Sequence, residues 1–107
     1  MTSHLIVLST LPDQKTAVRI AEELLRERLA ACVTVSPETR SFYWWQGEIS
    51  REKEFMLIIK TTTARYDDLE IFLRERHPYE VPEIAALPIL KGHAAYLDWM
   101  VRETTPD

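Results

Sequence analysis

Hydrophobic and polar positions along this chain follow two different periods, and together they predict four strands and three helices. Short apolar runs typical of buried strands occupy residues 5–8, 30–35, 55–61 and 83–87. Between residues 14 and 29 the apolar positions recur with a helical period instead, and this period returns after Thr62 or Thr63 and after Gly92-His93. The second helix is expected to end at His77-Pro78, because proline disfavours helical backbone at the preceding residue.

An aromatic segment lies between the second and third apolar runs. Residues 41–45 read Ser-Phe-Tyr-Trp-Trp and are followed by Gln46-Gly47 and then Glu48-Ile49. A two-residue connection that ends in glycine is typical of a tight β-hairpin, since glycine readily adopts positive φ. The pattern therefore predicts a long hairpin, over roughly residues 40 to 61, with an aromatic tip.

The order of the predicted elements indicates the fold class. Strand, helix, strand, strand, helix and strand form two interleaved strand–helix–strand units, and an extra helix follows. This predicts an α/β (α+β) fold: a ferredoxin-like sandwich with an antiparallel sheet, two helices on one face and a C-terminal helix. The length of 107 residues, without repeats or linkers, predicts a single domain over residues 1–107.

The strands are apolar at successive positions, which indicates that both faces of the sheet are buried. Residues 5–8 and 55–59 show this most clearly. Two helices cover only one face, so the second face needs another cover. One hypothesis is a homo-oligomer in which sheets pack together and hairpins wrap neighbouring subunits. The alternative is that the terminal helix and the hairpin fold back over the bare face.

Composition narrows the range of partners. The formal net charge is −4, and Lys and Arg alternate with acidic residues rather than cluster, which argues against a nucleic-acid partner. Cys32 is the only cysteine, so no intrachain disulfide can form, and this fits a reducing cytoplasm. The N-terminal residues resemble neither a signal peptide nor a membrane span, so no membrane association is expected.

The connector over residues 77–84 concentrates polar side chains on a stiff backbone, because Pro78 and Pro82 restrict it. His77 is a candidate metal ligand or proton shuttle, and a helix-capping role is the alternative. Tyr79 is a candidate interface anchor or catalytic acid. Glu83 and Lys60 each end a predicted strand of an apolar sheet. They are expected either to form an ion pair with each other or to bind a ligand.

Other candidates carry weaker signals. Cys32 lies in a predicted strand and is typical of a small buried hydrophobic residue. Trp44 and Trp45 are interpreted first as interface anchors. No nucleophile motif, zinc-protease helix or phosphate-binding glycine loop is present in the sequence. An enzyme hypothesis would use Lys60, Tyr79, Glu83 and His77 as general acid–base groups, but no sequence feature favours a particular reaction.

Several motifs together resemble the family of the divalent-cation tolerance protein CutA, in the right order and over almost the whole chain. They are Leu29-Ala30-Ala31-Cys32-Val33, Tyr43-Trp44-Trp45-Gln46-Gly47-Glu48-Ile49, Ile59-Lys60-Thr61-Thr62 and His77-Pro78-Tyr79-Glu80-Val81-Pro82-Glu83. The resemblance implies a ferredoxin-like homotrimer associated with tolerance to copper and other divalent ions. It also implies polar inter-subunit cavities, to which these residues would contribute: Cys32, Trp45, Lys60, Tyr79 and Glu83.

One departure from the family pattern bears on the metal chemistry. Some bacterial members of the family are credited with a copper site made from a cysteine of the first strand and two histidines before the Pro-Tyr pair. The matching positions here are Ser9, Arg76 and His77, so only His77 is retained as a ligand. The sequence predicts a cytoplasmic homotrimer with a role in the response to divalent metals, copper among them, and weak or indirect metal binding. The alternative is a regulatory module, similar to the PII signalling proteins, that binds a small anion or metabolite in the inter-subunit cavities.

Overall fold

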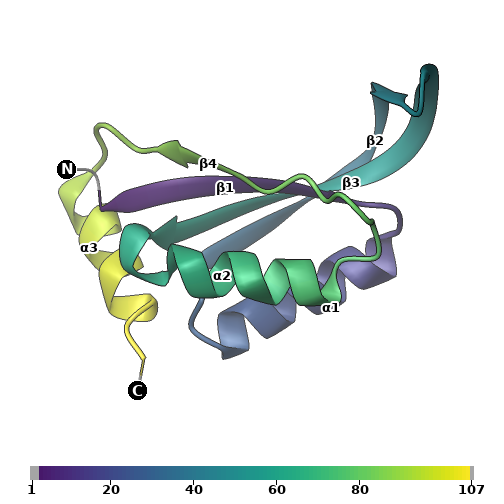
Figure 1. Ribbon diagram of the computed structural model, residues 1–107. Helices are drawn as coiled ribbons and strands as arrows, with labels where there is room; N and C mark the ends of the chain where they lie inside the picture. Colours follow the sequence, from purple (N-terminus) through teal and green to yellow (C-terminus); the bar gives the residue numbers. More distant parts are fainter. Residues whose placement is uncertain (1–2, 107) are drawn as a thin grey trace.

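The structure of this protein is a computed structural model, which describes residues 3–106. Four strands and three helices follow one another in the predicted order (Figure 1). They are β1 (His4–Leu11), α1 (Gln14–Arg26), β2 (Cys32–Trp45), β3 (Glu48–Thr62), α2 (Thr63–Arg76), β4 (Ala85–Pro88) and α3 (Ala94–Glu103).

The four strands form one antiparallel sheet in the order β2-β3-β1-β4. Helices α1 and α2 both lie on the same face of this sheet (Figure 1). This arrangement confirms the predicted ferredoxin-like sandwich, in which two interleaved strand–helix–strand units share one sheet.

Helix α1 begins where the sequence predicts and ends earlier. The Asp13 carboxylate caps its start by accepting a hydrogen bond from the Thr16 N–H at 2.7 Å. The prediction of a helix up to residue 29 is wrong, because Arg28 adopts φ +56° and closes the helix at Arg26. The N–H groups of Arg28 and Leu29 donate to the carbonyls of Leu25 and Leu24, which is a Schellman ending.

Strands β2 and β3 form the long hairpin that the aromatic segment predicts. Gln46 and Gly47 have φ angles of +51° and +82°, as a tight hairpin turn requires. Pairing runs from Trp45↔Glu48 down to Cys32↔Lys60 and is interrupted only by an irregularity between Val35 and Glu38. Beyond that irregularity the hairpin projects past the sheet as an arm, residues 38–55, which Figure 1 shows at the end opposite α3.

Strand β4 is shifted from its predicted position. It pairs with β1 over Ala85–Pro88 rather than residues 83–87, because residues 77–84 form the stiff connector that crosses to this edge. Helix α3 begins directly after Gly92-His93, as predicted, and buries Met100. It lies against the end of the sheet (Figure 1).

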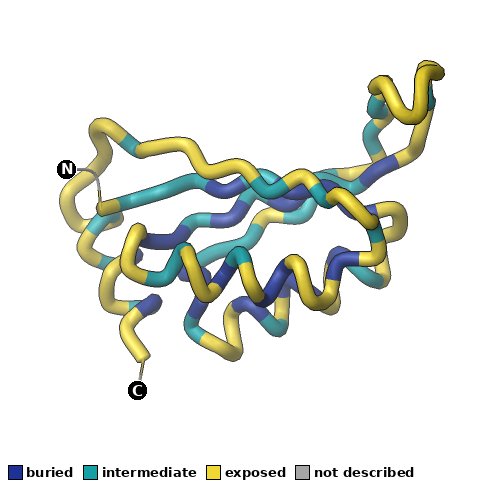
Figure 2. Tube along the Cα trace, viewed as in Figure 1, coloured by how far each residue is buried: buried dark blue, intermediate teal, exposed yellow. Residues whose placement is uncertain are grey.

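The two faces of the sheet are covered very differently (Figure 2). On the helix-covered face, Val7, Leu11, Leu57 and Ile59 are fully buried against α1 and α2. On the other face, cross-strand register aligns Cys32, Lys60, Ile6 and Leu87 in one row, and Thr34, Ile58, Leu8 and Ala85 in the next. Together with Met56, these residues are called the open face below: Ile6, Leu8, Cys32, Thr34, Met56, Ile58, Lys60, Ala85 and Leu87.

The alternative that the chain folds back over its own bare face is wrong for the described residues. Helix α3 packs at one end of the sheet, and the arm extends away from the other end (Figures 1 and 2). Leu87, at the β4 end of its row, remains 50% exposed. Among residues 3–106, no helix has the length and apolar character needed to cross a membrane.

Candidate functional site

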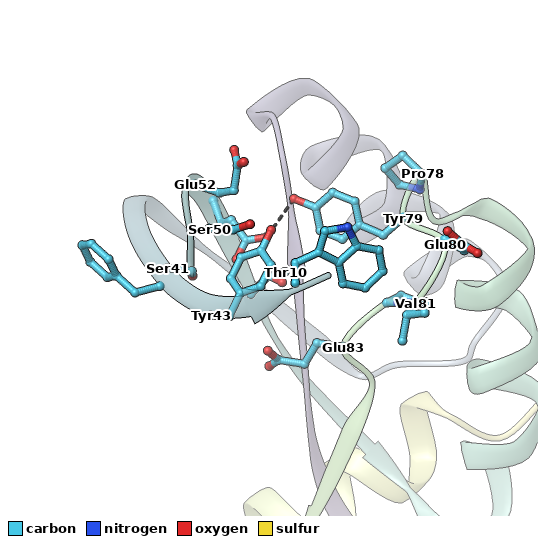
Figure 3. Close-up of a pocket in the computed structure, with 14 residues that line it drawn as sticks. Thr10, Ser41, Tyr43, Ser50, Glu52, Pro78, Tyr79, Glu80, Val81 and Glu83 are labelled. Carbon is cyan, nitrogen blue, oxygen red and sulfur yellow. Dashed lines mark hydrogen bonds between the residues drawn. The ribbon is translucent and has the colours of Figure 1, made fainter. Parts of the chain in front are cut away.

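A cavity of about 780 Å³ lies where the arm meets the connector (Figure 3). Its walls come from three segments that are distant in sequence: β1 at Thr10, the arm, and residues 78–83 of the connector. Its volume falls within the range of small-molecule sites, roughly 300–1,000 Å³. The lining residues are Thr10, Ser41, Phe42, Tyr43, Trp45, Ser50, Glu52, Glu54, Pro78, Tyr79, Glu80, Val81, Pro82 and Glu83.

His77 fixes the connector to β1. Its ring nitrogen Nδ1 accepts a hydrogen bond from the Tyr79 N–H at 3.1 Å, which leaves Nε2–H to donate to the Thr10 carbonyl at 2.7 Å. The His77 side chain is buried, and this burial lowers its pKa, although the Thr10 carbonyl and the Glu54 carboxylate oppose the shift. His77 is therefore a neutral, doubly hydrogen-bonded ring that holds the base of the cavity.

Tyr79 and Glu54 form the central polar contact of the cavity. The Tyr79 hydroxyl donates to Glu54 Oε2 at 2.7 Å (Figure 3). The Tyr79 ring lies 4.9 Å from the His77 ring. Burial and this carboxylate raise the pKa of Tyr79 well above its ordinary value. Glu54 is only 4% exposed. Sequence reasoning missed Glu54 because it lies in a charged stretch that resembles an ordinary surface turn, residues 51–54.

The two faces of the arm carry opposite charges. Direct cross-strand pairs place Tyr43 opposite Ser50, and Ser41 opposite Glu52, on the face that contains Glu54. The pairs on the other face are Arg40 with Lys53, Phe42 with Arg51, and Trp44 with Ile49. Alternation of side chains along a strand separates these two sets. The acidic face of the arm is continuous with the open face of the sheet, since even-numbered β3 residues form both.

The five residues predicted to line a ligand cavity fall into two groups. Trp45, Tyr79 and Glu83 line the cavity together. Cys32 and Lys60 lie opposite each other on the open face, several residues further along the strands. Within one chain Lys60 and Glu83 form no ion pair among residues 3–106, so the predicted pairing of these two residues is wrong for the single subunit.

The three positions matched by sequence to the copper ligands credited to some bacterial members do not fit a soft metal ion. Ser9 Oγ is fully buried on the helix-covered face and has no hydrogen-bond partner in the described structure. The Arg76 guanidinium lies 3.7 Å above the centroid of the Phe72 ring and is itself a cation. Both ring nitrogens of His77 are already hydrogen-bonded. The prediction that His77 binds a metal remains a prediction, and binding there would break one of these bonds.

The carboxylates around the cavity are also too dispersed for a metal ion. Among residues 3–106, no group of three or more His, Cys, Asp or Glu side chains is close enough to hold one. Figure 3 shows Glu52 on the arm, whereas Glu80 and Glu83 project from the connector. The cavity therefore has carboxylates on opposite walls, with aromatic side chains between them.

The sheet order, the helices on one face and the projecting hairpin define a ferredoxin-like protein with an arm. The sequence matches the family described as CutA1 divalent ion tolerance protein over residues 5–103, and the chain belongs to this family. The divalent-cation tolerance protein CutA of Thermus thermophilus is 48% identical over 100 residues, covering 94% of this chain and 96% of that protein. The CutA protein of Escherichia coli K12 is 40% identical, covering 92% of this chain and 88% of the relative.

Solved structures agree with this assignment. The Thermus thermophilus divalent cation tolerance protein superposes with a TM-score of 0.89 at 46% identity, covering 91% of this chain and 94% of that chain. CutA from Xylella fastidiosa gives a TM-score of 0.94 at 38% identity, covering 97% of this chain and all of the other. The fold is therefore that of CutA proteins over more than nine-tenths of the chain.

Proposed function

We propose that this chain acts in divalent-cation tolerance as a homotrimer whose subunits meet through the open face. Membership of the CutA family over 94% of the chain supports the role in tolerance. The open face supports the assembly, because the apolar side chains of Ile6, Leu8, Met56 and Ile58 lie on the face without helices and are only half-buried. Large apolar surfaces of this kind are typical of subunit contacts.

In the trimer, the five residues predicted to line a ligand cavity would lie close together, although they come from different subunits. Cys32 and Lys60 lie on the open face, and the cavity with Trp45, Tyr79 and Glu83 adjoins the same side of the sheet. Subunits that pack through this face would bring one chain's Lys60 row toward another chain's cavity. Sedimentation equilibrium tests the assembly: a mass three times the 12.5 kDa subunit is expected, and a monomer at micromolar concentration contradicts it.

We propose that copper and other divalent ions bind weakly or act indirectly. The hydrogen-bonded state of His77 and the presence of Ser9 and Arg76 at the other two ligand positions support this. Calorimetric titration of copper into the wild type and His77→Ala, with a weak chelator as competitor, tests it. Weak binding that is equal in both proteins is expected. One tightly bound ion per subunit, lost in His77→Ala, would contradict the proposal.

A cytoplasmic location is part of the same proposal. Its support is Cys32, a half-buried free thiol that suits a reducing compartment. One relative of known structure, from Archaeoglobus fulgidus, is described as a periplasmic divalent cation tolerance protein. Fractionation of the producing cells tests the location. Recovery of the protein with periplasmic markers would overturn the cytoplasmic assignment.

The position of Lys60 supports a second candidate function, that of a PII-like module that binds a small anion or metabolite between subunits. Lys60 is the only charged residue of the open face, where it lies between Cys32 and Ile6. A cation in an apolar setting favours an anionic partner. Thermal unfolding with inorganic phosphate and with ATP, in the wild type and Lys60→Ala, tests this function. A rise in melting temperature that Lys60→Ala abolishes is expected, and equal behaviour of both proteins excludes it.

A further inference from the structure

The guanidinium group of Arg76 is held in a fixed position at the end of α2. Its Cζ atom lies 3.7 Å above the centroid of the buried Phe72 ring, and its Nη1 donates to the Phe72 carbonyl at 3.5 Å. The Glu23 carboxylate of α1 lies 4.0 Å from its Nε, and the Glu75 carboxylate lies 3.7 Å from its Nη1. These contacts lie within one chain, between helices that cover the face opposite the open face (Figure 1). Arg76 therefore keeps a permanent positive charge between α1 and the last turn of α2.

His77, the next residue, offers a metal ion no free ring nitrogen. An ion at Nδ1 would displace the Tyr79 N–H, which donates to that nitrogen. An ion at Nε2 requires the ring proton to move to Nδ1, so the bond to the Thr10 carbonyl and the bond from the Tyr79 N–H would both be lost. In either position the ion would bind at the residue directly after a fixed cation, and like charges repel.

The carboxylates beside the end of α2 are engaged with Arg76. Divalent ions in proteins favour carboxylate, thiolate and neutral imidazole ligands. Glu23 and Glu75 are such carboxylates, and both lie within ion-pair distance of the guanidinium. Ser9, the first of the three matched positions, contributes only a neutral hydroxyl, which is fully buried. A side-chain cation thus already offsets the negative charge that would otherwise attract a bound ion.

We infer that Arg76 is the residue that determines metal selectivity at the end of α2: a built-in cation that pairs with the local carboxylates and excludes divalent ions from His77. The inference rests on the proposed function, in which ions bind weakly or act indirectly, and names the residue responsible. It also requires more than weak binding does. Exchange of Arg76 for a neutral ligand should make His77 a metal-binding residue without any other change in the chain.

Titration of Cu²⁺ into full-length wild type and Arg76→His, with a weak chelator as competitor, tests the inference. Arg76→His should bind one ion per subunit about tenfold more tightly than the wild type, the lower end of what one residue near a metal contributes to affinity. Cu²⁺ should also raise the melting temperature of Arg76→His and not that of the wild type, because an ion that binds the folded state stabilises it. The double variant Arg76→His/His77→Ala should lose both gains.

The chain offers a matched control in Arg74, two residues earlier on α2. Arg74→His makes the same exchange of a cation for an imidazole, but Arg74 is exposed and pairs with Glu70 at 3.4 Å. Its affinity for Cu²⁺ should stay within about twofold of the wild type. Should Arg76→His fail to fold, Arg76→Gln tests the repulsion alone. It should bind Cu²⁺ about threefold more tightly than the wild type at low ionic strength and equally in high salt, because salt screens charges.

Three results would overturn the inference, and they separate it from the proposed function. Equal gains in Arg74→His and Arg76→His would show unspecific binding to an added histidine. Weak binding in both the wild type and Arg76→His would overturn the role of Arg76 and leave the proposed weak or indirect binding intact. One tightly bound ion per wild-type subunit, lost in His77→Ala, would overturn the proposed function and this inference together.

Discussion

The helix-covered and open faces of the same sheet have similar apolar residues and different surroundings. Leu57 and Ile59 are fully buried beneath α1 and α2, whereas their neighbours Met56 and Ile58 are half-buried on the opposite face of the sheet. Strand neighbours point to opposite faces, so one apolar run supplies both surfaces. The difference teaches that the chain completes its core on one face and leaves apolar side chains on the other face only partly covered.

The largest expected effect is on the helix-covered face. Leu57→Ala should lower the free energy of unfolding by about 3 kcal/mol, because it leaves a cavity in a fully packed core. Denaturation by guanidinium chloride should give this loss at every protein concentration.

Ile58→Ala is the matched variant on the open face. The loss of unfolding free energy should depend on protein concentration, because the half-buried side chain is expected to become fully buried only when subunits associate. Unfolding measured at two protein concentrations, about fiftyfold apart, separates the cases. An equal and concentration-independent loss in Leu57→Ala and Ile58→Ala would break the distinction between the faces.

His77→Ala, at the edge where the connector joins the sheet, should lower the free energy of unfolding by about 2 kcal/mol. The variant removes two hydrogen bonds of the buried ring and leaves the Thr10 carbonyl without that donor. Thermal and denaturant unfolding measure the loss. A change below about 0.5 kcal/mol would show that Pro78 and Pro82 hold the connector without the ring.

The pKa of His77 predicts how stability depends on pH. Burial lowers this pKa below its ordinary value of 6.5, so between the two values the unfolded chain binds a proton that the folded chain does not. The stabilisation is complete above pH 6.5 and declines as the pH falls toward the folded pKa. The difference in unfolding free energy between pH 7.5 and pH 5.5 should shrink in His77→Gln. An unchanged difference would assign the effect to other groups.

Ser9→Ala is expected to give the smallest effect, and in the opposite direction. Ser9 Oγ is buried on the helix-covered face and makes no hydrogen bond in the described structure. Its removal should raise the free energy of unfolding by about 1 kcal/mol. Thr61→Ala serves as the contrast, because the Thr61 hydroxyl donates to the Leu29 carbonyl at 2.6 Å and its loss should destabilise. A destabilised Ser9→Ala would mean that the hydroxyl has a partner.

The fold could be predicted well from local signals. The Gln46-Gly47 turn, the Asp13 cap and the His77-Pro78 break each act within a few residues, so their outcomes follow from the sequence around them. The prediction of where α1 ends was wrong, because the residue that adopts the left-handed conformation there is Arg28 rather than the usual glycine. The shift of β4 depends on how far the connector reaches across β1, and no local pattern encodes that distance.

The candidate site could be predicted only in part. Tyr79, Glu83 and Trp45 carry recognisable motif signals and do line one cavity, but Glu54 has no such signal. Its burial follows from the connector folding over the base of the arm, where Tyr79 reaches it across 25 positions of sequence. Lys60 and Glu83 were both predicted at strand ends, yet Glu83 lies in the connector before β4. The register of β3 places Lys60 on the open face, away from the cavity.

By itself, the sequence determined the order of strands and helices, the hairpin turn and the presence of apolar residues on both faces of the strands. Residue periodicity and backbone preferences are properties of neighbouring residues, and these features depend on nothing else. Only the tertiary structure decided which apolar face is left open, that His77 uses both ring nitrogens within the chain, and that Glu54 is buried with no ion-pair partner among residues 3–106. Those outcomes depend on contacts between segments far apart in the chain, and the register that creates them exists only after the sheet has formed.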